Sequence, residues 1–232
     1  MKTVTLGKRL SAIAALVSSK TLLDVGSDHG KLPCFLLQTG KIQSAVLTDI
    51  NPLPLEKAKN KAASFGLLPK TSFYLANGLD LPENVLSACD TIVIAGMGGE
   101  LIAEILSSEN RRFLAGKQLI LQPMSKPEEL RAVLFRLGFE IKGETVLFEN
   151  GKYCVIVEAV YNDKPYHADI YTGKLNPRDP AARDYITKRL HAAEKSLLNL
   201  KNAAGDVTSA VKQLKSARDS YKAFLEVKDE NK

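Results

Sequence analysis

The segment Leu22–Gly30 constrains the fold of this chain more than any other. It is a short apolar run that contains Asp24, leads directly into Gly26 and is followed by a helical pattern. A strand that ends in a glycine turn before a helix is typical of the carboxyl edge of an open α/β sheet, where cofactors bind. The dinucleotide-binding fingerprint needs glycine at its third and sixth positions, which here are Asp28 and Lys31. The carboxylates of Asp24 and Asp28 would repel the diphosphate of NAD. They would attract the ammonium and sulfonium groups of S-adenosylmethionine (SAM), so the sequence favours SAM over NAD.

A second acid follows at the spacing that a nucleoside cofactor requires. The apolar run Ala45–Asp49 ends in a carboxylate about 20 residues beyond the glycine turn, where such a group reaches the hydroxyls of a bound ribose. Strand-end acids such as Asp24 and Asp49 can also simply cap loops. The pair of acids with the glycine turn between them predicts a nucleoside cofactor.

Composition limits the other classes of protein. The 232 residues are 45% hydrophobic and 25% charged, which is usual for a soluble globular protein with one core and an appendage, or with two small domains. The three cysteines have no metal-binding spacing, which argues against zinc and against a disulfide framework and is consistent with a cytoplasmic protein. No run approaches the roughly 20 apolar residues of a membrane span, and Leu6–Val17 has the spacing of an amphipathic helix rather than of a signal peptide. The net charge of +6 favours an anionic partner such as RNA.

Between residues 21 and 161, short apolar runs alternate with helical stretches, which predicts a parallel sheet covered on both faces. The predicted strands are Thr21–Val25, Ala45–Asp49, Thr71–Leu75, Thr91–Ala95, Gln118–Leu121, Phe139–Leu147 and Tyr153–Val160. The predicted helices are Lys31–Gln38, Pro52–Phe65, Glu100–Leu106 and Pro127–Leu137. Asn150 and Gly151 between the last two strands indicate a tight hairpin. A parallel sheet that finishes with an antiparallel hairpin is the α/β, Rossmann-like arrangement of class I SAM-dependent methyltransferases, by analogy of fold.

The pattern changes near Asp163, so we expect a SAM-binding domain over residues 1–162 and an appendage over residues 163–232. Asp179 followed by Pro180 reads as a helix N-cap with proline at the first helical position. Two apolar seams with coiled-coil spacing follow, separated by Gly205 and Asp206, and they predict an antiparallel helical hairpin. The seams are Ile186, Leu190, Ala193, Leu197, Leu200 and Ala204, then Val207, Ala210, Leu214, Ala217, Tyr221 and Phe224. Two ordinary helices packed on the main domain are the alternative.

Three further strand ends are rich in glycine or polar residues. They are Ala95–Gly99, Asn77–Asp80, and Gln122 with Pro123. Each could be only a structural turn, but the carboxyl ends of parallel strands meet at one edge of a sheet, so we expect them to outline one pocket. An amide at Asn77 could read the adenine of the cofactor.

The order of these motifs resembles one family. Gly26–His29 followed by Leu32 and Pro33, then Ala95–Gly99, then Leu121–Pro123, then Tyr153, is similar to the bacterial TrmK family. The resemblance extends over essentially the whole chain and implies a SAM-dependent tRNA (adenine-N1)-methyltransferase that acts at tRNA position 22, with tRNA as its partner. Gly30 and Lys31 depart from the small and aromatic residues that the family often has there.

The motifs and the resemblance together give the candidate site residues. Those expected to bind SAM are Asp24, Gly26, Ser27, Asp28, His29, Asp49, Ile50, Asn77, Gly78, Leu79, Ala95, Gly96, Met97 and Gly98. Asp28 and His29 are also the catalytic candidates, although His29 could instead be a hydrogen-bonding scaffold. Those expected to bind the substrate are Arg9, Lys31, Gly99, Gln122, Pro123, Arg178, Arg183, Lys188 and Arg189. No metal and no membrane contact is expected, and the protein should be a monomer or a weak homodimer.

Two other functions fit the same residues. A SAM-dependent methyltransferase of a small molecule would share every cofactor residue and would not need the basic residues of the hairpin. A non-catalytic adaptor would use the hairpin to recruit a partner, but the intact acids and glycine turns weigh against it.

Overall fold

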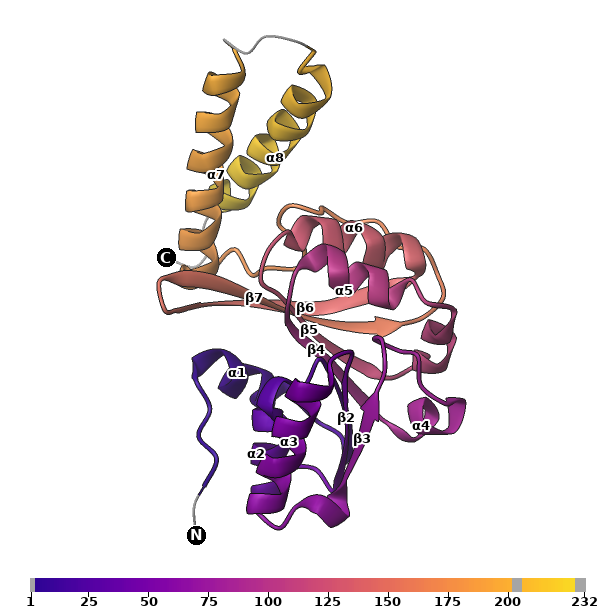
Figure 1. Ribbon diagram of the computed structural model, residues 1–232. Helices are drawn as coiled ribbons and strands as arrows, with labels where there is room; N and C mark the ends of the chain where they lie inside the picture. Colours follow the sequence, from indigo (N-terminus) through magenta and orange to yellow (C-terminus); the bar gives the residue numbers. More distant parts are fainter. Residues whose placement is uncertain (1–2, 202–205, 228–232) are drawn as a thin grey trace.

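The computed structural model describes residues 3–201 and 206–227, with the side chain of Asp28 outside the description. A sheet of seven strands, in the order β3-β2-β1-β4-β5-β7-β6, forms the centre of the molecule (Figure 1). The strands are β1 (Thr21–Val25), β2 (Ser44–Asp49), β3 (Thr71–Leu75), β4 (Thr91–Met97), β5 (Gln118–Pro123), β6 (Phe139–Glu149) and β7 (Lys152–Tyr161). The first five are parallel, and β7 runs antiparallel to both β5 and β6. The predicted sheet is confirmed.

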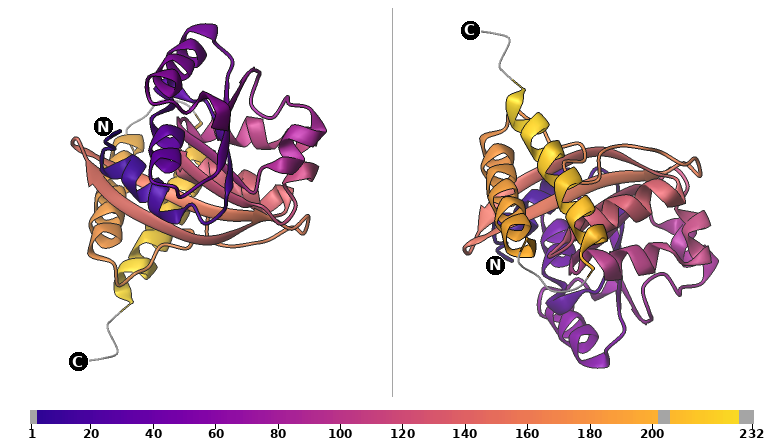
Figure 2. Two further views of the ribbon diagram at one scale, coloured as in Figure 1. Left: turned by 90° about the horizontal axis from the view of Figure 1, so that it is seen from below. Right: turned by 90° about the horizontal axis from the view of Figure 1, so that it is seen from above.

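Helices cover both faces of the sheet, as Figures 1 and 2 show. On one face lie α1 (Lys8–Leu16), α2 (Lys31–Gln38) and α3 (Pro52–Ser64); on the other lie α4 (Glu83–Ala88), α5 (Gly99–Leu106) and α6 (Pro127–Leu137). The central strands β1, β4 and β5 are therefore buried on both sides, which explains why they read as continuous apolar runs. The sequence did not predict four short elements, because segments of three to six residues are too short to show helical periodicity. They are α4 and the 3-10 turns η1 (Asp28–Gly30), η2 (Leu68–Lys70) and η3 (Glu109–Leu114).

The β6–β7 hairpin turns at Asn150 and Gly151, as predicted. Their φ angles of 50° and 79° are those of a turn with two left-handed residues, whose twist matches that of the flanking strands. Because β6 runs parallel to β5 and is longer, the turn projects beyond the carboxyl edge of the parallel strands.

The segment that joins the sheet to the last two helices is anchored by a buried ion pair. Arg131 on α6 donates from Nε to Glu144 Oε1 on β6 at 2.8 Å, and both side chains are fully buried. Arg131 Nη1 also donates to the carbonyl oxygens of Ile170 and Tyr171, at 2.9 and 3.1 Å. Glu144 Oε2 accepts from the Lys174 N–H at 2.7 Å. The connecting segment is thus part of the core of the sheet domain.

The last two helices, α7 (Pro180–Leu200) and α8 (Thr208–Glu226), form the predicted antiparallel hairpin above the sheet (Figure 1). Asp179 is the N-cap of α7, and its carboxylate accepts from the Ala181 N–H at 3.0 Å. The seam is closed at the base, where the buried residues are Ala182, Tyr185, Ile186, Ala193, Ala217, Tyr221 and Phe224. Toward the tip Leu197 and Leu200 are only half-buried and Ala210 is exposed. The predicted seam and turn residues Ala204 and Gly205 lie outside the described residues.

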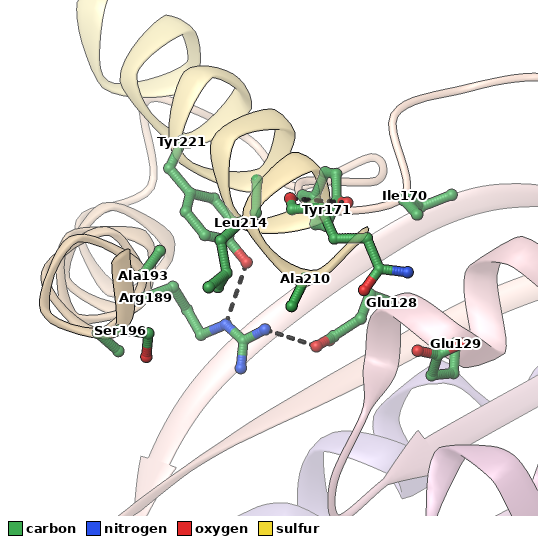
Figure 3. Close-up of a pocket in the computed structure, with 13 residues that line it drawn as sticks. Glu128, Glu129, Ile170, Tyr171, Arg189, Ala193, Ser196, Ala210, Leu214 and Tyr221 are labelled. Carbon is green, nitrogen blue, oxygen red and sulfur yellow. Dashed lines mark hydrogen bonds and ion pairs between the residues drawn. The ribbon is translucent and has the colours of Figure 1, made fainter. Parts of the chain in front are cut away.

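Between these two helices and α6 lies a cavity of about 410 Å³ (Figure 3). Small side chains from both helices line it, and Arg189 reaches across it. Its guanidinium donates to Glu128 on α6 at 2.7 Å and to the Tyr221 hydroxyl on α8 at 3.2 Å. Arg189 therefore ties both helices of the hairpin to the sheet domain. None of the described helices is long and apolar enough to cross a membrane.

Candidate active site

The glycine turn after β1 is fastened to the end of β2. The N–H groups of Gly26 and Ser27 both donate to the Thr48 carbonyl oxygen, at 2.8 and 3.0 Å. Gly26 has a φ of +74°, and a Cβ at this position would collide with the methyl group of Met97. The backbone conformation is what favours glycine here, since other residues rarely adopt it, whereas the flexible Met97 side chain could move aside. The turn therefore leaves Asp24 and Asp49 on neighbouring strands at one edge of the sheet.

Asp24 is a buried acid whose ionised form is disfavoured by its surroundings. Its side chain is buried, and the Ser27 hydroxyl donates to its Oδ2 at 2.6 Å. Burial raises the pKa of Asp24 to about 6, and repulsion from Asp49 adds to this effect, while the hydrogen bond from Ser27 opposes it. A cation placed beside this carboxylate would relieve the cost of its burial. Asp49 lies more openly and accepts from the Asn51 N–H at 2.8 Å.

Two cavities adjoin these acids. The larger, of about 550 Å³, lies within the usual range of small-molecule sites. Its lining includes eight of the residues that the sequence predicts for the cofactor, namely Gly26, Asp49, Ile50, Asn77, Gly78, Ala95, Gly96 and Met97. The smaller, of about 140 Å³, is lined by Asp24, His29 and Lys31 among others. The two share Arg9, Gly26 and Ala95, so together they form one cleft.

Several lining residues were not expected from the sequence, and Thr48 is the most informative of them. Its hydroxyl is buried and has no hydrogen-bond partner among the described residues, although it belongs to the wall of the larger cavity. A buried polar group without a partner is costly unless a ligand or water satisfies it. Ile50 and Leu101 offer exposed apolar surface at the same cavity. The signal that could have found Thr48 is its position just before Asp49 on a strand that ends at the cofactor edge.

Several predicted cofactor or substrate residues do not line the cleft. Leu79 is buried in the core on the α5 side of the sheet. Gly98 is the N-cap of α5, and Gly99 donates its N–H to the Ser125 carbonyl oxygen at 2.8 Å. A Cβ at Gly99 would collide with the backbone at Ser125 and Lys126, so this glycine permits close packing of α5. Ser27 also lies outside both cavities, where its hydroxyl donates to Asp24.

On the substrate side, Gln122 positions Arg9 rather than facing a ligand. Gln122 is fully buried, and its Oε1 accepts from Arg9 Nη1 at 2.7 Å, while its Nε2 donates to the Pro123 carbonyl oxygen at 2.8 Å. Pro123 is also buried and lies outside both cavities. The result is a guanidinium from α1 fixed over the junction of the two cavities.

His29 has a φ of 63° inside the turn η1, a conformation that is uncommon for a residue with a side chain. This backbone turns the chain sharply between β1 and α2, and it brings His29 into the wall of the smaller cavity. Because the side chain of Asp28 lies outside the described residues, the structure places only the backbone of this catalytic candidate, at the start of η1.

The basic residues of the hairpin base have different surroundings. Arg183 donates to the carbonyl oxygens of Pro177 and Leu225, which ties the start of α7 to the end of α8. Arg189 makes the ion pair of Figure 3. Arg178 lies in the segment before α7, where its N–H donates to the Asn176 side chain. Lys188 differs from these three arginines, because its ammonium group lies over two aromatic rings of the β6–β7 hairpin. The two arginines on α7 therefore hold the hairpin together.

The sheet order, the glycine turn and the two strand-end acids define the class I SAM-dependent methyltransferases. A family model described as "Methyltransferase domain" matches residues 6–157. The tRNA (adenine(22)-N(1))-methyltransferase of Bacillus subtilis strain 168 is 28% identical over 240 residues, which cover 99% of each chain. The Streptococcus pneumoniae protein Sp1610 in complex with S-adenosyl-L-methionine is 32% identical, with a TM-score of 0.81 over 96% of this chain and 100% of that one. The B. subtilis TrmK structure shares the fold, at 24% identity and a TM-score of 0.84 over 96% and 100% of the two chains. This chain belongs to the TrmK family of methyltransferases.

Proposed function

We propose that this protein transfers a methyl group from SAM to N1 of the adenine at position 22 of tRNA. The observation that carries the proposal is the cleft in which Asp24 and Asp49 flank a glycine turn, in a chain that matches TrmK proteins along its whole length. The B. subtilis relative is named for this reaction. We propose further that the protein acts in the cytoplasm.

The residues of the cleft fit SAM. Asp24 would hold its ammonium group, Asp49 its ribose hydroxyls, and Asn77 with Gly78 its adenine. Thr48 would gain the hydrogen-bond partner that it lacks among the described residues. When bound, SAM supplies a methyl group on a sulfonium, which is ready for direct displacement.

The chain itself has mainly to position the target base. The smaller cavity, beside Asp24 and His29, would receive the adenine, whose N1 lies on its Watson–Crick edge and must first be exposed. The methylated base is cationic, so carboxylates nearby lower the barrier, whereas the guanidinium of Arg9 suits a phosphate at the mouth of the cleft. Asp28 would stabilise the developing charge or accept the proton that leaves the adenine amino group.

We also propose a division of labour along the chain. Residues 1–162 would hold SAM and perform the transfer, and within residues 163–232 the hairpin of α7 and α8 would contact the body of the tRNA, while the segment before α7 belongs to the sheet domain. The described part of the chain has no cluster of three or more His, Cys, Asp or Glu side chains that could hold a metal. The reaction is expected to need none, in a monomer or weak homodimer.

Methyl transfer from labelled SAM to unmodified tRNA tests the function directly. We expect nucleoside mass spectrometry to find N1-methyladenosine, and we expect it to disappear when the adenine at position 22 is replaced. No incorporation by a protein that still binds SAM would favour the small-molecule methyltransferase. Failure to bind SAM would favour the adaptor.

Replacing Asp28 by alanine separates catalysis from cofactor binding. We expect kcat to fall by roughly 10²- to 10⁴-fold, which is the usual contribution of a positioned acid or base, while the Kd for SAM stays nearly unchanged. Single-turnover kinetics and calorimetric SAM binding give the two quantities. If SAM affinity collapses together with kcat, Asp28 is a cofactor ligand and its catalytic role is wrong.

A further inference from the structure

Three side chains form an aromatic and cationic surface at the tip of the β6–β7 hairpin. We call Phe148, Tyr153 and Lys188 the aromatic platform. Phe148 and Tyr153 face each other across the two strands, with ring centroids 4.9 Å apart and planes at 53°. Lys188 Nζ from α7 lies 5.4 Å from the centroid of Phe148 and 4.7 Å from that of Tyr153. Phe148 nevertheless keeps 48% of its surface exposed, which is more than any other phenylalanine or tyrosine side chain that the structure describes.

The aromatic platform is held from behind. The Tyr153 hydroxyl donates to Asp184 and accepts from Lys188 at 3.1 Å. Tyr185, which is buried, packs under Tyr153 with ring centroids 5.6 Å apart. The rings are therefore fixed by the base of α7, while the outer surface of Phe148 remains open. A preorganised ring loses little entropy when a planar ligand stacks on it.

The aromatic platform lies at the same edge of the sheet as the cleft. The strand registers put the pair of Phe148 and Tyr153 beyond the last residue of β5, on the side where the parallel strands end. Figure 1 shows this hairpin projecting between the base of α7 and helix α1, which carries Arg9. Gly7, just before α1, lies beside the Glu149 carboxylate at the hairpin tip.

The chemistry of this surface suits an unpaired nucleobase. Every base has a π-face that can stack on an exposed aromatic ring, and a nearby ammonium can pair with the phosphate of the same nucleotide. Lys152 and Lys8 add positive charge around the tip, and both are exposed. An aromatic ring that served only to pack the hairpin against α7 would be buried, whereas the ring of Phe148 is half-exposed and has a cation beside it. We propose that the aromatic platform stacks an unpaired base of the tRNA and so holds the tRNA in register with the cleft. The naming of tRNA as the ligand rests on the proposed function.

The composition of the chain allows a direct test, because it contains no tryptophan. Phe148→Trp puts a single indole on the aromatic platform, and its fluorescence should be quenched in a saturable way when tRNA is added. Leu68→Trp is the matched control, because Leu68 is 40% exposed and precedes β3 at the opposite edge of the sheet. Its fluorescence should not change over the same titration.

Kinetics of Phe148→Leu complete the test, since leucine keeps the apolar character and removes the stacking face. We expect KM for tRNA to rise by roughly 5- to 150-fold, with the Kd for SAM unchanged. Lys188→Gln should reduce the slope of log Kd for tRNA against log salt by about one. Methylation of tRNA by an unquenched Phe148→Trp protein would overturn the aromatic platform and leave the proposed function intact. Quenching of Phe148→Trp by tRNA, together with no methylation by the unsubstituted protein, would support the platform and refute the function.

Discussion

Replacing Asp24 by asparagine is expected to weaken SAM binding strongly and, at the same time, to make the free protein more stable. The pKa of Asp24 is raised from 3.8 to about 6 in the folded chain, so its ionised form is disfavoured by about 3 kcal/mol at neutral pH. This cost of folding grows as the pH rises from 3.8 and is complete above pH 6. Asparagine removes the charge and can still accept from the Ser27 hydroxyl. The expected gain in Tm at pH 8 is roughly 6–12 °C, whereas the loss of a charged partner should weaken SAM binding by roughly 100-fold.

Thermal unfolding and calorimetric SAM titration between pH 5 and 8 test this prediction. In the unsubstituted protein the Kd for SAM should rise about tenfold for each pH unit below pH 6, because a proton competes with the ligand for Asp24. In Asp24→Asn this dependence should vanish. Asp49→Asn is the matched control: it should weaken SAM binding and raise Tm far less than Asp24→Asn does, because Asp49 is only half-buried and its repulsion is the smallest of the effects on the pKa of Asp24. A less stable Asp24→Asn protein that still binds SAM would show that the carboxylate has a structural role instead.

Replacing Glu144 by alanine is expected to destabilise the protein more than any change at its surface. The substitution leaves the Arg131 guanidinium buried without its counter-charge and the Lys174 N–H without its acceptor. Breaking a buried ion pair in this way costs roughly 3–5 kcal/mol, which corresponds to a fall in Tm of roughly 6–20 °C for a chain of this size. Urea and thermal unfolding give the two values.

Glu140→Ala is the control, because Glu140 lies on the same strand and pairs with Lys142 at 2.8 Å on the surface. Exposed pairs contribute less than about 1 kcal/mol, so its Tm should hardly move. Equal effects of the two substitutions would refute the anchoring role of the buried pair.

The buried pair of Arg131 and Glu144 also shows why removal of all residues beyond Asp163 is a poor test of tRNA binding. That truncation deletes the carbonyl groups of Ile170 and Tyr171 to which Arg131 donates, so it would damage the sheet domain itself.

The parts of this molecule that follow from local pattern could be predicted from its sequence. Buried parallel strands read as apolar runs, and glycine turns mark their ends. Since these ends meet at one edge, Asp24, Asp49 and Asn77 could be assigned to one cleft before the structure was known. Helical spacing likewise predicted α7 and α8 and the N-cap at Asp179.

What could not be predicted depends on partners that are distant in sequence. Periodicity shows which face of a helix is polar, but not that Arg183 and Arg189 are bonded within the protein while Lys188 lies over aromatic rings. Gln122 was expected to contact the substrate because it ends a strand, yet its burial makes it a support for Arg9. The pair of Arg131 and Glu144 gives no signal, since each is an ordinary charged residue in an amphipathic element.

The length of the helical hairpin can be considered separately from the structure of the cleft. The ties of the hairpin to the sheet domain include the ion pair of Arg189 with Glu128 and the hydrogen bond from the Tyr171 hydroxyl to the Gln213 carbonyl oxygen of α8, at 3.3 Å. Helices of 21 and 19 residues extend about 30 Å. Adding or removing seven residues in each helix would change that length by about 10 Å and keep the seam in phase. The length of the hairpin could therefore be altered by mutation without changing the residues of the cleft, and under the proposed function this would change how far the hairpin reaches along the tRNA.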